Sequence, residues 1–132
     1  MYFLDTNTCI YFLNGTYESI KLKILETPPN IISIPSIVKA ELLLGAYKSM
    51  NRKRTLEKVE YFLEPFEITP FTDQMTYTYA EIRSDLEKTG NIVGPNNLLI
   101  ASIVQYCNGI LVTNNTAEFK RIKNLKLKNW IQ

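Results

Sequence analysis

The chain has 132 residues, of which 45% are hydrophobic and 21% charged, so it is long and apolar enough for one folded domain, 1–132, and too apolar for a disordered chain. Its 15 Lys and Arg residues against 13 Asp and Glu give a net charge of +2, which neither proves nor opposes a nucleic-acid partner. Histidine is absent, which excludes Ser-His and Cys-His hydrolysis and most zinc sites.

Nothing in the sequence predicts a secreted or membrane protein. The first residues lack a basic segment followed by a long apolar run, so we expect no signal peptide. The uncharged stretch from Thr89 to Ala117 is interrupted by Gly94 and Pro95, which is typical of a buried core rather than of a membrane span. Cys9 and Cys107 lack metal or redox spacing and are predicted to be buried hydrophobic residues. We therefore expect a cytoplasmic protein with no membrane partner.

The first half of the chain alternates short apolar runs with helical patterns. In chain order, these patterns predict a strand at Tyr2–Leu4, a helix capped by Asp5 or Thr6 that ends at Asn14-Gly15, a helix around Ile20 and Ile24 that ends before Pro28, a strand at Ile31–Ile34, a helix from an N-cap at Ser36 to about Tyr47, and a helix over Arg52–Phe62. Strands separated by helices in this way are typical of βαβ crossovers.

The second half continues the alternation. It predicts a short strand at Phe66–Ile68, a helix capped by Asp73 that runs to about Lys88 and is stopped by Gly90, a helix from Pro95 to about Cys107, a strand at Ile110–Val112, and an edge strand between Leu125 and Trp130. The whole pattern predicts an α/β fold with a parallel sheet covered by helices on both faces. Because ligands bind beyond the carboxyl ends of such strands, functional residues should be sought there.

Polar residues follow two of the predicted strands. Asp5 ends the first strand, and Thr113-Asn114-Asn115 ends the strand at Ile110–Val112. If these two strands are neighbours, their polar ends meet at one edge of the sheet. Asp5 is explained equally well as a simple helix N-cap, and Asn115 as a turn residue.

Glu41 lies on a predicted apolar helix. One stripe of that helix consists of Ile37, Ala40, Leu44 and Tyr47, and Glu41 is beside it. A carboxylate buried in this stripe requires a charge partner or a metal ion. Alternatively, Leu42, Leu43 and Ala46 form the buried side and Glu41 lies at its exposed margin, which the pattern alone slightly favours.

The segment Gly94–Ala101 is a loop that leads into an apolar helix. The first turn of this helix contains Asn96 and Asn97. Considered alone, either amide is explained as a helix cap.

Together these segments resemble the PIN-domain ribonucleases, and within them the VapC toxins of bacterial toxin-antitoxin pairs. The matching segments, in family order, are Leu4–Asn7, Ala40–Leu42 with Gly45-Ala46, Ile92–Ala101, Leu111–Thr116 with Glu118-Phe119, and Asn129-Trp130. This resemblance covers essentially the whole chain. It implies a three-layer α/β/α sandwich with a parallel sheet of four to five strands, and an acidic site that binds Mg²⁺ or Mn²⁺ for endoribonuclease activity.

The resemblance also implies roles for individual residues. The catalytic positions of the family fall on Asp5, Glu41, Asn97 and Asn115, with the metal held by the first three and supported by Thr6, Asn7 and Thr113. The family's third acid, normally Asp, is replaced here by Asn97. Because an amide supplies one neutral oxygen where a carboxylate supplies an anionic group, we expect weaker metal binding and impaired cleavage.

Two basic clusters are candidates for contact with RNA phosphates. The first consists of Lys48, Arg52, Lys53 and Arg54, and the second of Lys120, Arg121, Lys123, Lys126 and Lys128. Such runs most often form solvated surface, but in the context of this family we favour RNA contact for at least one of them.

The resemblance implies a structured RNA substrate, with tRNA as the first candidate, and a VapB-like antitoxin that covers the acidic cleft. It further implies a homodimer and a complex that binds operator DNA only through the antitoxin. The alternative is a catalytically inactive PIN domain that binds an antitoxin or RNA, and Asn97 is the residue that favours it.

Two other protein classes fit the sequence poorly. A phosphate-accepting receiver domain would need an acidic pair near Asp5, and a nucleotide-binding enzyme would need a Gly-rich loop. The chain has neither feature.

Overall fold

A computed structural model describes all of residues 1–132 and contains a five-stranded sheet in the order β3-β2-β1-β4-β5. The strands are β1 Tyr2–Leu4, β2 Ile32–Pro35, β3 Glu67–Thr69, β4 Ile110–Val112 and β5 Lys126–Lys128. Every neighbouring pair is parallel, and β1 lies at the centre with Leu4 opposite Val112 of β4. The predicted α/β fold with a parallel sheet is therefore confirmed, and β1 and β4 are neighbours as the site prediction required.

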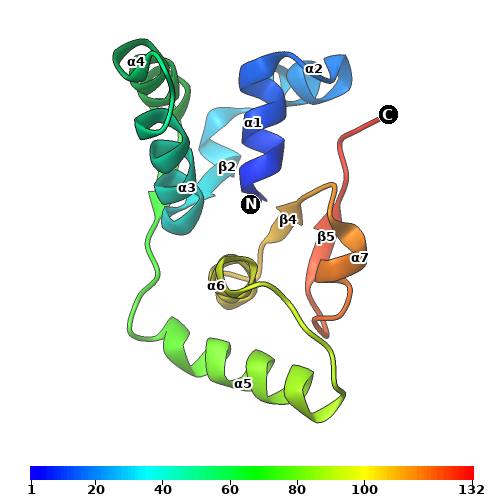
Figure 1. Ribbon diagram of the computed structural model, residues 1–132. Helices are drawn as coiled ribbons and strands as arrows, with labels where there is room; N and C mark the ends of the chain where they lie inside the picture. Colours follow the sequence, from blue (N-terminus) through cyan, green and yellow to red (C-terminus); the bar gives the residue numbers. More distant parts are fainter.

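Helices connect the strands and cover the sheet (Figure 1). They are α1 Thr6–Asn14, α2 Glu18–Glu26, the 3-10 turn η1 Pro29–Ile31, α3 Ser36–Tyr47, α4 Arg52–Leu63, α5 Met75–Lys88, α6 Pro95–Tyr106 and α7 Thr116–Phe119. In Figure 1, α1 to α4 occupy the upper half, α5 and α6 the lower half, and α7 lies beside β5. The sequence patterns did not predict α7. None of the helices has the length and apolarity needed to cross a membrane.

Two of the predicted signals at helix ends are confirmed around α1. The Asp5 carboxylate accepts a hydrogen bond from the backbone N–H of Thr8, which makes Asp5 the N-cap of α1. Gly15 ends the same helix with φ of 65°, a left-handed conformation that glycine adopts without steric cost.

Two other predicted caps are wrong. Ser36 is the first residue of α3 rather than its cap, and its hydroxyl accepts a hydrogen bond from the N–H of Phe71 instead. Asp73 does not cap α5 with its side chain, because that helix begins at Met75 and only the Asp73 carbonyl accepts bonds from Thr76. At Ser36 a long-range hydrogen bond replaces the predicted cap, and at Asp73 a local turn replaces it.

The core is a single cluster of 27 buried hydrophobic residues centred on the sheet. On α3, Val38, Leu42 and Ala46 are buried, whereas Leu44 is exposed. The second prediction for this helix is therefore the correct one, and Glu41 lies half-buried at the margin of the buried side. Cys9 is buried as predicted. Cys107 is exposed, contrary to prediction, because it follows the end of α6 in a surface turn.

Candidate active site

Asp5 is a buried carboxylate at the carboxyl end of the central strand. Its side chain is 5% exposed and accepts hydrogen bonds through both oxygens. Oδ1 accepts from the backbone N–H of Thr8 at 2.9 Å, and Oδ2 accepts from the hydroxyl of Thr113 at 2.5 Å. Thr113 is fully buried and directly follows β4. Asp5 thus serves as a helix cap while it also lies where the polar ends of β1 and β4 meet.

The surroundings of Asp5 make its ionised form costly. Burial raises the pKa of Asp5 above its ordinary value, and the negative charge of Glu41 raises it further. The hydrogen bonds from Thr113 and Thr8 act in the opposite direction without cancelling the effect of burial. A cation bound near this carboxylate would offset the cost of its charge.

Glu41 is brought to the site by side chains from two other helices. Its Oε1 accepts a hydrogen bond of 2.5 Å from the hydroxyl of Thr6, the residue after Asp5. Its Oε2 accepts a bond of 3.3 Å from the side-chain amide of Asn96, in the first turn of α6. Both carboxylate oxygens of Glu41 are therefore held by neutral donors.

Glu118 is a third carboxylate at the same edge of the sheet, and the sequence analysis did not include it among the site residues. Its Oε2 accepts hydrogen bonds of 2.7 Å from the side-chain amides of both Asn97 and Asn115, and its Oε1 accepts one of 3.0 Å from the N–H of Gly94. Burial alone would raise the pKa of Glu118, but these three donors and the charge of Arg121 together lower it. Glu118 therefore stays ionised without a bound metal.

The structure connects the predicted site residues in two hydrogen-bonded groups, which we call together the network; the groups adjoin in the chain through Asp5-Thr6 and Asn96-Asn97. The backbone N–H of Asn115 donates to the Thr113 hydroxyl at 2.9 Å, which links the Asp5 end of the network to Glu118. Six of the predicted residues take part in these contacts, namely Asp5, Thr6, Glu41, Asn97, Thr113 and Asn115. Asn7 does not, because its side chain is exposed and makes no hydrogen bond within the molecule.

The first basic cluster forms no hydrogen bond with this network. Lys48, Arg52, Lys53 and Arg54 are exposed at the turn between α3 and α4. The guanidinium of Arg52 lies 5.0 Å from the centroid of the Tyr47 ring, and its Nε donates to the Tyr47 carbonyl. None of the four side chains forms an ion pair or hydrogen bond with a site acid.

A signal for Glu118 was present in the sequence. Asn115 and Glu118 are three residues apart, a spacing that places both side chains on one side of a single helical turn. That turn is α7, whose four residues are too few for a periodic hydrophobic pattern. The helix α7 is recognised only in the structure, where its Glu118 accepts a hydrogen bond from the backbone N–H of Gly94.

The donor atoms of the site suit a hard divalent cation in type but supply little charge. Mg²⁺ and Mn²⁺ prefer oxygen ligands, and the carboxylates of Asp5 and Glu41 and the amide oxygen of Asn97 are of that kind. Across the whole chain, however, no group of three or more Asp, Glu, Cys or His side chains lies close enough together to hold a metal ion. A cation here would depend on two carboxylates, an amide and the phosphate of a substrate.

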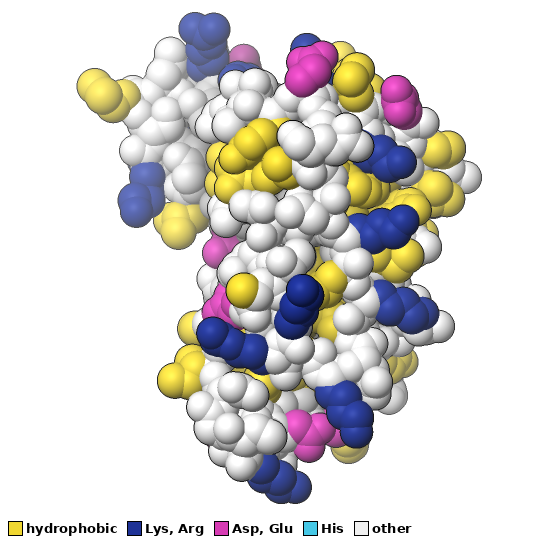
Figure 2. Space-filling model, turned by 90° about the vertical axis from the view of Figure 1, so that its right-hand side faces the viewer, with side chains coloured by type: hydrophobic (Ala, Val, Ile, Leu, Met, Phe, Trp, Pro, Cys, Tyr) yellow, Lys and Arg dark blue, Asp and Glu magenta, His cyan; other side chains and the backbone are white.

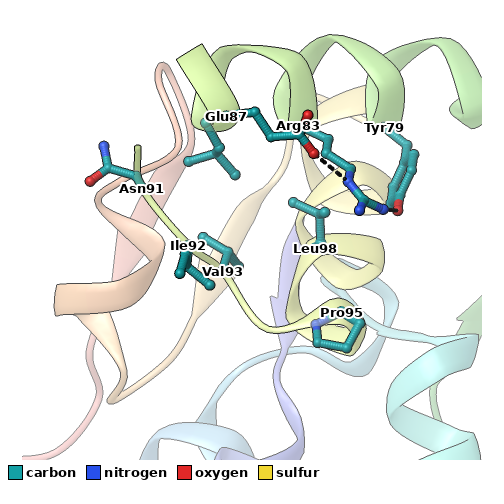
Figure 3. A pocket seen from close by; sticks show the side chains of 9 residues that line it. Tyr79, Arg83, Glu87, Asn91, Ile92, Val93, Pro95 and Leu98 are labelled. Carbon is teal, nitrogen blue, oxygen red and sulfur yellow. Dashed lines mark hydrogen bonds and ion pairs between the residues drawn. The ribbon is translucent and has the colours of Figure 1, made fainter. Parts of the chain in front are cut away.

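Cavities lie on two sides of the network. One of about 150 Å³ is lined by Glu41 together with Ile10 and Leu13 of α1 and residues of α3 and α4. A larger cavity of about 380 Å³ lies between α5 and the loop before α6, and Figure 3 shows Arg83 there beside Glu87 and Tyr79. No site acid lines the larger cavity, although Pro95, the residue before Asn96 in the first turn of α6, is part of its lining.

Comparison with known proteins gives consistent matches over the full length. The PIN domain family model matches residues 2–125. The chain is 46% identical over 132 residues to Ribonuclease VapC2 of Rickettsia felis, covering 98% of each. It is 35% identical over 130 residues to the tRNA(fMet)-specific endonuclease VapC of Salmonella typhimurium, covering 98% of this chain and 97% of that relative.

Solved structures give the same picture. A chain in the crystal structure of VapBC2 from Rickettsia felis bound to a DNA fragment from the promoter is similar with a TM-score of 0.91, at 45% identity and over 98% of each chain. A chain in the DNA-bound VapBC structure from Salmonella typhimurium has a TM-score of 0.92 at 33% identity, covering 98% of this chain and 97% of the other.

Proposed function

Since the chain belongs to the PIN-domain family, and within it to the VapC ribonucleases, we propose that it is a toxin of the endoribonuclease type that acts on tRNA with Mg²⁺ or Mn²⁺. The observation that carries this proposal is the network at the carboxyl edge of the sheet. In it, Thr6, the residue after Asp5, donates to Glu41, and Thr113 and Asn115 link the buried carboxylate of Asp5 to Glu118. The name of the Salmonella typhimurium relative favours tRNA over other RNA classes.

Each residue of the site would have its own role in RNA cleavage. Asp5, Glu41 and the amide oxygen of Asn97 would hold the divalent cation, which when bound supplies positive charge for the phosphate oxygens and acidifies water. Thr113 fixes the orientation of the Asp5 carboxylate through its hydrogen bond. Glu118 is kept ionised by its donors and would supply a fixed negative charge beside Asn97 and Asn115. No imidazole is needed for this chemistry, in agreement with the absence of histidine.

We further propose that Asn97 weakens the activity of this chain. Its amide nitrogen is committed to Glu118, and only its neutral oxygen remains for a cation. The same contact favours a second candidate function, a PIN domain that binds RNA or an antitoxin without cleaving. In that case the amide keeps the site folded in the absence of a metal ion.

The proposed protein partner is a VapB-like antitoxin, through which the complex would bind operator DNA, as the DNA-bound complexes of relatives suggest. An apolar groove of about 380 Å³ between α1, α2 and α4 supports this proposal. It shares Leu13 and Lys58 with the cavity at Glu41, so a peptide lying in the groove would extend toward the acidic cleft. We also propose that the toxin forms a homodimer.

The test is an RNA cleavage assay with total tRNA and Mg²⁺ or Mn²⁺, run on the parent chain, on Asn97→Asp, and on Asn97→Asp combined with Asp5→Asn. We expect Asn97→Asp to cleave at least about tenfold faster than the parent, and the double variant to be inactive. If the parent and Asn97→Asp both bind tRNA without cleaving it, the chain is a binding module. If neither binds nor cleaves tRNA or ribosomal RNA, the ribonuclease proposal is wrong.

A further inference from the structure

A row of lysines without acidic partners follows the candidate site in the sequence. We call it the lysine row, and it consists of Lys120, Lys123, Lys126 and Lys128. All four residues are exposed. None forms an ion pair, because the single salt bridge of the molecule joins Arg83 to Glu87 on α5. No acidic residue occurs after Glu118, so the positive charge of this segment is uncompensated.

The first and last residues of the lysine row are close to residues of the site, either along the chain or across the sheet. The backbone N–H of Thr113 donates to the carbonyl of Lys128 at 2.8 Å, while the Thr113 hydroxyl donates to Asp5. Lys128 is therefore the neighbour, across the sheet, of the residue that holds Asp5. At the other end of the segment, Lys120 is two residues after Glu118. Both ends of the row thus lie next to groups of the site.

The spacing of the lysines on β5 suits a polyanion with regularly spaced phosphates. Residues two apart in a strand point to the same side, so Lys126 and Lys128 project together with about 6.6 Å between them, a spacing comparable to that of successive phosphates in a nucleic-acid strand. Leu127 between them is half-buried. The Lys126 ammonium donates a hydrogen bond of 3.1 Å to the neutral side chain of Asn108 and forms no ion pair. β5 pairs with β4 alone, so its outer edge is open.

Arg121 differs from the lysines that flank it. Its guanidinium donates to the carbonyl of Ile92, in the loop that leads to Asn97, and its charge acts on Glu118. Arg121 therefore holds the site loop. Figure 2 shows the side of the molecule that lies to the right in Figure 1, where β5 and α7 are found, and Lys and Arg side chains are spread over the middle of this face with fewer Asp and Glu among them.

Lysines on an edge strand also prevent unwanted pairing with other strands. That explanation covers Lys126 and Lys128, but Lys120 and Lys123 lie outside the strand. We propose that the lysine row binds the sugar-phosphate backbone of RNA next to the scissile phosphate. This inference rests on the proposed function, since RNA is the partner that would bring phosphates to Asp5 and Glu118.

The experiment is equilibrium binding of fluorescently labelled tRNA to the full chain, with a chelator present so that no cleavage occurs. The test variant is Lys126→Gln with Lys128→Gln. The matched control is Lys21→Gln with Lys88→Gln, which removes the same charge from exposed positions on α2 and α5, outside both basic clusters. We expect the test variant to bind at least about tenfold more weakly and to lose about 1 from the salt slope for each lysine, and the control to change little.

Four results would overturn the inference, and they can be told apart. If the test variant keeps the affinity and salt slope of a parent that binds tRNA, the lysine row does not bind RNA, and the proposed function is unaffected. Equal losses in the test variant and the control would show unspecific attraction by net charge. A duplex DNA that the parent binds more tightly than tRNA, with this binding lost in the test variant, would assign the row to DNA. A parent that binds no RNA would overturn the proposed function as well.

Discussion

The side-chain amide of Asn97 donates a hydrogen bond of 2.7 Å to Oε2 of Glu118. An aspartate in the same place would set two negative charges against each other, and a bound cation would then be needed to relieve the repulsion. The amide removes this need, because it donates a hydrogen bond to the ionised Glu118. This contact satisfies Glu118 without a metal ion, which is the physical basis of our proposal that Asn97 weakens metal binding.

Asn97→Asp should lower the free energy of unfolding in the absence of divalent cations by about 1–2 kcal/mol, since a charged hydrogen bond is replaced by repulsion at a partly exposed site. Added Mg²⁺ or Mn²⁺ should restore the lost stability in the variant and have little effect on the parent. Urea denaturation with and without the cation measures both effects.

The control for this prediction is Asn97→Ala, which removes the hydrogen bond without adding charge. We expect Asn97→Ala to be destabilised less than Asn97→Asp without metal and to gain nothing from added cation. An aspartate variant that is as stable as the parent in a chelator would contradict the role assigned to the contact with Glu118.

Asp5→Asn should be more stable than the parent at neutral pH, because the variant no longer buries a charge. Burial holds the pKa of Asp5 above its ordinary value of 3.8. The folded parent therefore binds this proton more tightly than the unfolded chain, and its stability rises as pH is lowered from above the raised pKa toward 3.8. The advantage of Asp5→Asn should consequently shrink as pH falls through that range.

Denaturation of the parent and of Asp5→Asn side by side, in steps from neutral pH down to about pH 4, measures this difference. Groups other than Asp5 titrate in both proteins and cancel in the comparison. A stability difference that widens as the pH falls would show that Asp5 is stabilised in its ionised form, contrary to the expectation.

Thr113→Val should destabilise the protein by about 1–3 kcal/mol, because the fully buried hydroxyl both donates to Asp5 and accepts from the N–H of Asn115. The loss of the donor should also raise the pKa of Asp5 further. Thr113→Ser keeps the hydroxyl and serves as the matched control, with a smaller loss due to the missing methyl group. Equal stability of the valine variant and the parent would show that the hydroxyl is dispensable.

Gly109→Ala should destabilise the fold by about 1–3 kcal/mol, since an added Cβ would lie 2.3 Å from Cε1 of the buried Phe3 on the central strand. Gly45→Ala is the matched control on α3, where an added Cβ would meet no atom within 4 Å. There the higher helix propensity of alanine should stabilise the protein by about 0.5–1 kcal/mol. Thermal unfolding of both variants checks the opposite signs.

The centre of the parallel sheet was predictable because β1 and β4 are short apolar runs with sharp ends. Tyr2–Leu4 stops at Asp5 and Ile110–Val112 stops at Thr113, so both the sheet and the polar edge were visible in the sequence. The burial of α3 was harder to predict, since two helix faces carry apolar residues. Only the packing against the sheet shows that Leu42 and not Leu44 is buried.

The part of the site that the sequence did not reveal depends on contacts between distant segments. Glu118 is significant because α7 carries it to the loop at Gly94, 24 residues away, where it accepts a backbone N–H. Periodicity within four residues cannot indicate such a contact. Ser36 illustrates the same limit, because the hydrogen bond that its hydroxyl accepts comes from Phe71, 35 residues away.

The most direct test of the central claim is a calorimetric titration of Mn²⁺ into the parent, Asn97→Asp, and Asn97→Asp with Asp5→Asn, without RNA. If the site is a divalent-cation site weakened by Asn97, Asn97→Asp will bind Mn²⁺ at least about tenfold more tightly than the parent, and the double variant will lose that gain. Equal Mn²⁺ affinity in the parent and Asn97→Asp, or a gain that survives loss of the Asp5 carboxylate, would contradict the account.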